Sequence, residues 1–129
     1  MTIKVKDLEG KEVWVAYAYF STNRGRIINH MKPTELTIRN VVCKNEKNVY
    51  FEFYNKKNKK IRVSVSNTLS IYGASVIKNE LGELAIDLCI LYETEDEARE
   101  AYNSAILNAI DYVTSDCQSK IKYLNSKLL

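Results

Sequence analysis

The stretch that decides the fold is TEDEAREAYNSAILNAIDYVTSDCQSKIKYLNSKL, residues 94–128. Thr94 and Glu97 form a capping-box pattern, in which the threonine and the glutamate satisfy backbone N–H groups at a helix start. The first turn is also acidic, which suits the positive end of a helix dipole. The pattern therefore predicts that a helical region, residues 93–129, begins here.

Apolar side chains then recur in steps of three and four, as they do on one face of a helix. They are Ala98, Ala101, Tyr102, Ala105, Ile106, Ala109, Ile110, Val113, Cys117, Ile121, Leu124 and Leu128. A second capping box, Ser115 to Gln118, leaves open whether 95–128 is one long helix or two. One helix would be about 50 Å long and would outreach a small domain. Part of the 98–128 stripe then needs a cover, and we expect a homo-oligomer that supplies it.

Most of the chain before this helix has the composition of β-strands, rich in aromatic and β-branched residues. Strands are expected over 12–20, 35–44, 49–54, 61–65 and 84–91, with an ambiguous sixth through Leu69 and Ile71. Residues 21–33 read as a polar loop. Strands followed by helix predict an α+β fold. We expect a strongly bent antiparallel sheet, or a small partly closed β-barrel, of five or six strands.

Size and composition favour one domain, residues 1–129, with a β-rich region over 1–92. The chain has 129 residues, 46% of them hydrophobic, and only four glycines and one proline. No apolar run is long enough to span a membrane, and the N-terminus lacks the order of a signal peptide. Three scattered cysteines favour a reduced, cytoplasmic compartment with buried thiols.

Charge is distributed unevenly between the two halves. Residues 1–66 carry fourteen Lys and Arg against six Asp and Glu, a net of +8, whereas residues 67–129 carry five against ten, a net of −5. A basic sheet region can attract an anionic ligand. The asymmetry can equally hold two halves or two subunits together.

The loop Arg24-Gly25-Arg26 is the sharpest local feature. Gly25 can adopt a positive φ, so that neighbouring N–H groups form an anion-binding concavity between two guanidiniums. Arginine suits phosphate because its planar fork donates two parallel hydrogen bonds. An exposed polar turn between strands is the alternative interpretation.

Aromatic and further basic residues extend this candidate site. Rings such as Tyr17, Tyr19 or Tyr54 could stack on a nucleotide base, and Arg62 lies in the same basic sheet region. If a small ligand is held between sheet and helix, Arg99 could supply a polar contact to it. These residues could equally be ordinary surface and core.

The lysines of the 56–60 hairpin lie next to aromatic residues in the sequence, the mixture that nucleic-acid-binding sheets use. A lysine-rich tip also protects a sheet edge from aggregation. Whether this hairpin is functional or only solubilising stays open, and binding of nucleic acid is a further alternative.

No catalytic or metal-binding motif is visible, and no cofactor is expected. His30 is the single histidine, so no imidazole metal cluster can form. No spacing of nucleophile, base and stabiliser indicates an enzyme.

Two runs, Leu91-Tyr92-Glu93-Thr94-Glu95-Asp96-Glu97-Ala98 and Lys32-Pro33-Thr34-Glu35-Leu36-Thr37-Ile38, resemble small proteins of phages and mobile elements. The order of a bent sheet and C-terminal helices is similar to the phage sponges that sequester signalling nucleotides of Thoeris defence. The likeness is architectural, and none of the ligand-binding residues of that family can be matched here.

The leading hypothesis is a non-catalytic, oligomeric binding protein that captures a small anionic ligand, most plausibly a signalling nucleotide. The alternative is a protein-interaction module, such as a phage inhibitor of a host defence protein or nuclease.

Overall fold

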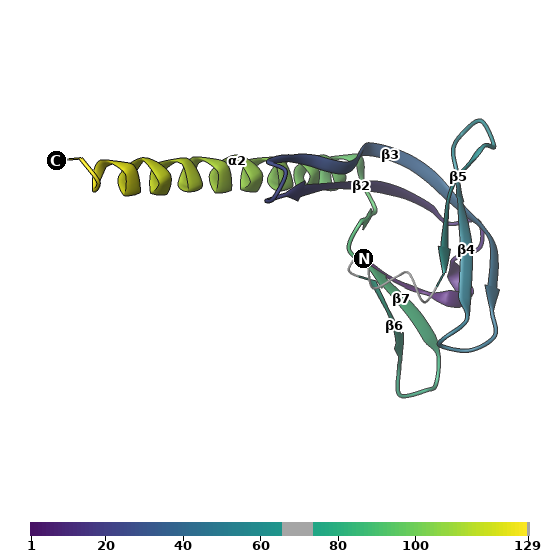
Figure 1. The fold of residues 1–129 in the computed structure, drawn as a ribbon. Helices are drawn as coiled ribbons and strands as arrows, with labels where there is room; N and C mark the ends of the chain where they lie inside the picture. Colours follow the sequence, from purple (N-terminus) through teal and green to yellow (C-terminus); the bar gives the residue numbers. More distant parts are fainter. Residues whose placement is uncertain (66–73, 129) are drawn as a thin grey trace.

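The computed structural model describes residues 1–65 and 74–128, which form a sheet-rich head and a long projecting arm (Figure 1). The elements in chain order are β1 (Thr2–Lys4), the short 3-10 helix η1 (Val5–Asp7), β2 (Glu12–Ser21), β3 (Arg26–Cys43), β4 (Val49–Tyr54), β5 (Lys60–Val65), β6 (Ala74–Lys78), β7 (Leu84–Leu88), β8 (Leu91–Tyr92) and α2 (Glu95–Asn125). The α+β class and the order of sheet before helix are confirmed.

The strands form two sheets, so the expected single bent sheet or partly closed barrel is wrong. One sheet has the order β5-β4-β3-β2-β8 and the other has the order β1-β7-β6, and all described pairs are antiparallel. Closing a barrel requires the two edge strands to pair. Here β8 pairs with β2 through only two residues and the chain then leaves into α2, so β5 and β8 stay apart as edges.

The long strand β3 explains the largest error in the expected boundaries, the polar loop at 21–33. Only residues 22–25 form a turn, and β3 starts at Arg26 and pairs back along β2. A register shift leaves Lys32 and Pro33 opposite Ala16. Such a bulge tolerates a residue without a backbone N–H, which is how Pro33 fits inside a strand.

One apolar core joins the two sheets. Phe51 and Phe53 point to the same face of β4, as the strand alternation predicts, and their rings meet edge to face at 5.4 Å. The buried core residues are Ile3, Leu8, Val13, Val15, Leu36, Ile38, Val49, Phe51, Phe53, Ile86, Leu88, Ile90 and Leu91. The core belongs to the head, and the helix contributes only the buried Ala98 outside this cluster.

The helical region is one continuous helix. Thr94 is its N-cap, and the threonine hydroxyl accepts a hydrogen bond from the Glu97 N–H at 3.2 Å, as the capping box predicts. The helix runs through the second capping box without a break. Asp116 and Lys120 form an ion pair one turn apart across that point, with 2.9 Å between carboxylate and ammonium.

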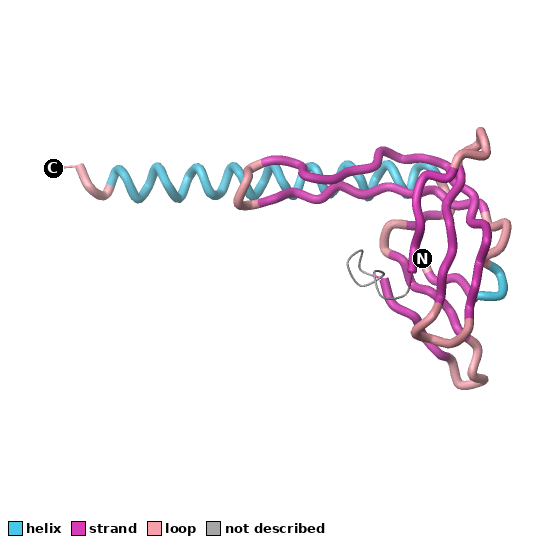
Figure 2. Tube along the Cα trace, turned by 45° about the vertical axis from the view of Figure 1, so that its right-hand side comes forward, coloured by secondary structure: helices cyan, strands magenta, loops and turns pink. Residues whose placement is uncertain are grey.

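The C-terminal part of α2 stands beyond the rest of the described chain (Figure 1). The outer part of the β2–β3 hairpin runs alongside its first half, and past the hairpin tip the helix continues alone (Figure 1, Figure 2). We call this unit, residues 17–31 together with α2, the arm. No helix in the described part of the chain combines the length and apolar character needed to cross a membrane.

The expected burial of the thiols is wrong, because Cys43, Cys89 and Cys117 are all exposed. They lie at the end of β3, in the turn between β7 and β8, and on the projecting half of α2, none of which faces the core. The expected short strand through Leu69 and Ile71 lies outside the described residues.

The N-cap allows a direct test of how α2 is anchored. Thr94→Ala removes the acceptor for the Glu97 N–H and should lower the free energy of unfolding by about 1 kcal/mol. Thr94→Ser keeps the hydroxyl and should stay close to wild type. Urea unfolding followed by circular dichroism measures the difference. Equal stability of the alanine and serine variants would contradict this assignment of the helix start.

Candidate functional site

The arm is held together by the face of β2 that carries small side chains. Ala18 pairs with His30 of β3, and the His30 Nδ1 lies 3.1 Å from the Tyr102 hydroxyl of α2. Two residues after Ala18, the Phe20 ring meets Tyr112 at 5.9 Å between centroids. This face therefore points toward the helix, and alanine allows the close approach.

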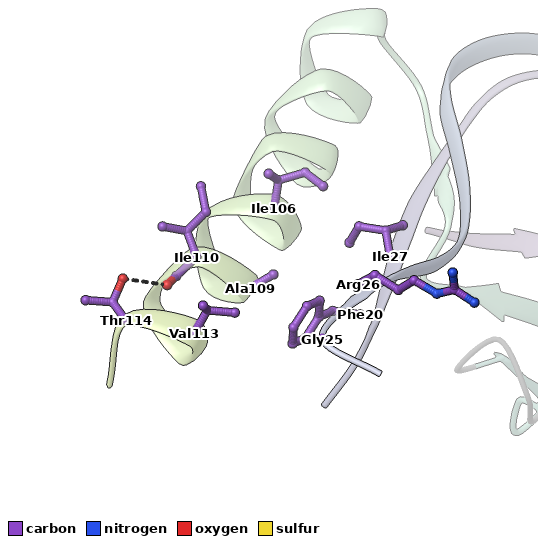
Figure 3. Close-up of a pocket in the computed structure, with 9 residues that line it drawn as sticks. All are labelled: Phe20, Gly25, Arg26, Ile27, Ile106, Ala109, Ile110, Val113 and Thr114. Atoms are coloured by element: carbon purple, nitrogen blue, oxygen red, sulfur yellow. Dashed lines mark hydrogen bonds between the residues drawn. The ribbon is translucent and has the colours of Figure 1, made fainter. Parts of the chain in front are cut away.

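An open apolar groove of about 340 Å³ lies where the hairpin tip meets the helix (Figure 3). It is lined by Phe20, Gly25, Arg26 and Ile27 from the hairpin and by Ile106, Ala109, Ile110, Val113 and Thr114 from α2. The Thr114 hydroxyl donates to the Ile110 carbonyl within the helix, and the Arg26 guanidinium points away from the groove. The remaining lining is apolar, so the groove suits hydrophobic side chains.

The predicted anion site lies at the tip of this hairpin. Gly25 has φ +67°, as expected for the residue that reverses the chain. The Gly25 N–H donates to the Ser21 carbonyl at 2.8 Å, and the Arg24 N–H donates to the Ser21 hydroxyl at 3.2 Å. These two N–H groups hold the turn, so an anion here would be bound by the exposed side chains of Arg24 and Arg26.

Tyr17 and Tyr19 lie on β2 and face away from α2. Their rings stack on each other, with 5.3 Å between centroids and 27° between planes. Tyr17 also packs against the core of the head. The pair stands on the opposite face of the hairpin from the apolar groove.

Tyr54 belongs to a separate polar cluster centred on Glu52, on the outer face of β4. The Glu52 carboxylate accepts hydrogen bonds from the Asn40 side chain, the Tyr50 hydroxyl at 2.9 Å and the Tyr54 hydroxyl at 3.2 Å. The Lys60 ammonium lies 3.3 Å from the same carboxylate. These contacts, the Asn40 bond first, lower the pKa of Glu52 to about 2. This cluster therefore already contains an anion of its own, the Glu52 carboxylate.

The structure brings only some of the predicted residues together: Tyr17, Tyr19 and the Arg24–Arg26 turn share the β2–β3 hairpin, whereas the other three lie on β4, β5 and α2. Arg26 starts β3, and Thr37, the strand partner of Tyr54, comes eleven residues later, up to about 35 Å along a strand. Arg62 pairs with Phe53 in β5, and its side chain lies outside the description. Arg99 pairs with Glu95 at 2.9 Å on the first turns of α2.

A second groove, of about 440 Å³, contains a residue that the sequence analysis did not select. Trp14, Pro33, Thr34, Glu35, Asn55, Lys56 and Lys57 line it. The Lys56 ammonium lies 2.8 Å from the Glu35 carboxylate. Trp14 is the single tryptophan and borders the lysine hairpin. Only the register of β2, β3 and β4 brings it there, which the sequence pattern does not specify.

No protein-family model, no curated protein and no solved structure matches this chain. Within residues 1–65 and 74–128 there is also no group of three or more metal-ligating side chains that could hold an ion.

The Glu52 cluster predicts a defined pH dependence. The folded-state pKa lies below the ordinary value of 4.5, so the unfolded chain binds the proton first as the pH falls. The contribution of Glu52 to stability is therefore present above pH 4.5 and lost toward pH 2. Glu52→Gln should flatten the fall in urea midpoint between these values, whereas Glu46→Gln, in an exposed turn, should not. Identical pH profiles for both variants would contradict the assigned role.

Proposed function

We propose that this protein is a non-catalytic binding protein that works as an assembly, and that the arm is its protein-binding surface. The observation that carries the proposal is the apolar surface of α2. Ile110 is 53% exposed, Ile121 52% and Leu124 63%, on a helix whose C-terminal part extends past the tip of the β2–β3 hairpin (Figure 1). Apolar side chains gathered on one exposed face mark sites of protein association.

The groove gives this surface a shape. It opens between the hairpin tip and α2, and its walls supply Phe20, Ile27 and Val113. An amphipathic helix laid along α2 would place its apolar side chains there, the mode of recognition in which a helix fills a hydrophobic groove. A small anionic ligand gains little from such a lining, because it needs cations and N–H donors.

The size of the protein in solution tests this proposal. Light scattering after size exclusion should give a mass above the 14.9 kDa of one chain for protein purified from its source cells. Val113→Lys places a charge on the apolar surface and should return the mass to a single chain. Val113 is half exposed, so the isolated chain tolerates the lysine.

Asn108→Lys is the matched control, because Asn108 is exposed on the opposite side of α2 and should leave the assembly intact. A mass of one chain for the wild type, across micromolar to high micromolar concentrations, would rule out the arm as a protein-binding surface.

Capture of an anionic ligand, in the manner of a nucleotide sponge, is the second candidate function. The observation that favours it is the groove beside Trp14, where an indole ring borders the lysines at positions 56 and 57. An aromatic ring and an ammonium are the groups that hold a base and a phosphate. Arg24 and Arg26 at the hairpin tip offer an alternative phosphate site, and neither has an ion-pair partner among the described residues.

Fluorescence separates the two anion sites, with adenosine diphosphate as the probe. Binding beside the single tryptophan should change its emission, and Lys57→Glu should weaken that binding by at least about tenfold, since a charged hydrogen bond contributes about 1.5–3 kcal/mol. Lys44→Glu, at a distant turn, is the control. Binding that is lost in Arg24→Ala and Arg26→Ala but leaves the emission unchanged would move the site to the hairpin tip. No binding at all would remove this candidate for nucleotides.

A further inference from the structure

The exposed apolar residues of α2 form a regular stripe that continues past the end of the β2–β3 hairpin. Ile110, Val113, Cys117, Ile121 and Leu124 are all exposed, and the first two also line the groove at the hairpin tip. Toward the C-terminus the stripe belongs to the part of α2 that extends beyond the hairpin (Figure 2). A single surface therefore runs from the groove to the end of the helix.

The spacing of this stripe keeps it on one side of the helix, so that a second straight helix can pack along it. Ile110 and Ile121 are eleven residues apart, as are Val113 and Leu124, and an eleven-residue repeat advances 3.67 residues per turn. That value is close to the 3.6 of an α-helix, so the stripe stays on one side of a straight helix. The intervals of three, four, four and three residues also read the same from either end, with Cys117 in the middle.

We propose that the occupant of the arm is a second copy of this chain, with its α2 antiparallel and the two Cys117 residues facing each other across the two-fold axis. This inference rests on the proposed function and names its partner. Ile110 of each chain then lies opposite Leu124 of the other, and Val113 lies opposite Ile121. Because the intervals are palindromic, an antiparallel pair centred on Cys117 sets every stripe residue opposite another stripe residue. A parallel pair would also be in register, so the charges beside the stripe decide between the two arrangements.

The second copy also completes the groove. The antiparallel arrangement brings its Leu124 next to Ile110, on the open side of the groove whose far wall is Phe20 and Ile27. A leucine side chain there fills an apolar space that the single chain leaves open to water. The hairpin tip is thus part of the interface, and each groove is finished by the other chain.

Charge favours the antiparallel arrangement over the parallel one. Asp116 and Lys120 lie on one flank of the stripe and pair with each other at 2.9 Å. A two-fold axis perpendicular to the helices brings the same flank of both chains to the same side, so each Lys120 also approaches Asp116 of the second copy. A parallel pair would set this flank against the uncharged Thr114, Gln118 and Asn125. Antiparallel helix dipoles add to the preference.

Disulfide trapping tests the arrangement, since a disulfide needs Cα atoms about 4.4–6.8 Å apart. In a background with Cys43→Ser, Cys89→Ser and Cys117→Ser, one tagged chain carries Ile110→Cys and a differently tagged, co-expressed chain carries Leu124→Cys. Oxidation should link the two tags into a covalent dimer. Leu124→Cys alone should not link to itself, because the two copies of position 124 are offset by about 21 Å, fourteen residues at 1.5 Å each. All substituted positions are exposed, so the fold of the single chain is not at risk.

Each result decides a different point when it is combined with the mass in solution. A two-chain mass with the mixed link is the expected result. A two-chain mass in which Leu124→Cys links to itself would overturn the antiparallel arrangement and leave the proposed protein-binding role standing. A complex with a different protein would overturn the second copy as occupant and leave the same role standing. A single-chain mass would overturn both.

Discussion

The packing of the β2–β3 hairpin against the first half of α2 determines the shape of the whole molecule. Alanines on β2 let the helix lie close, and contacts such as Phe20 with Tyr112 and His30 with Tyr102 fix it along the hairpin. A helix of 31 residues is about 46 Å long, whereas β3 and β2 can support only part of it. The C-terminal part of α2 projects beyond the hairpin because the helix is longer than the hairpin.

The head and the arm differ in where their apolar side chains lie. The head buries its apolar residues between two sheets, and the polar side chains on the outer face of β4 hydrogen-bond to Glu52. The arm leaves an apolar stripe and a groove in water. Exposing such side chains is unfavourable by roughly 25 cal/mol for each square ångström, which favours association. The surface that we propose for assembly is therefore separate from the apolar core of the head.

The sequence predicted those features that depend on neighbours in the chain. The helix start at Thr94, the bounds of β4 and its inward Phe51 and Phe53 follow from capping and alternation, which are local. It did not predict that Arg26 to Pro33 belongs to a strand, because this stretch has no strand-like alternation of its own. Its hydrogen-bonding partner β2 and the packing of α2 hold it in the extended form. The division into two sheets depends in the same way on distant pairings.

The candidate site shows the same limit. Arg24, Tyr17 and Tyr54 were chosen by residue type, and the register then distributed them over a turn, one face of a hairpin and a closed polar cluster. The apolar stripe was visible in the sequence, but the groove beside it needed the contact of Phe20 and Ile27 with the helix. Trp14 was similarly invisible, because only the sheet brings it to the lysine hairpin.

Amide hydrogen exchange in residues 114–125 tests the central claim, that a second chain covers the projecting half of α2. An unsupported helix end exchanges quickly, whereas an interface protects it. We predict slow exchange in this segment at high protein concentration and a marked loss of protection on dilution, while the core strand β4 stays equally protected at both. Fast exchange in residues 114–125 at every concentration would show that the arm stands alone in solution and would contradict the account.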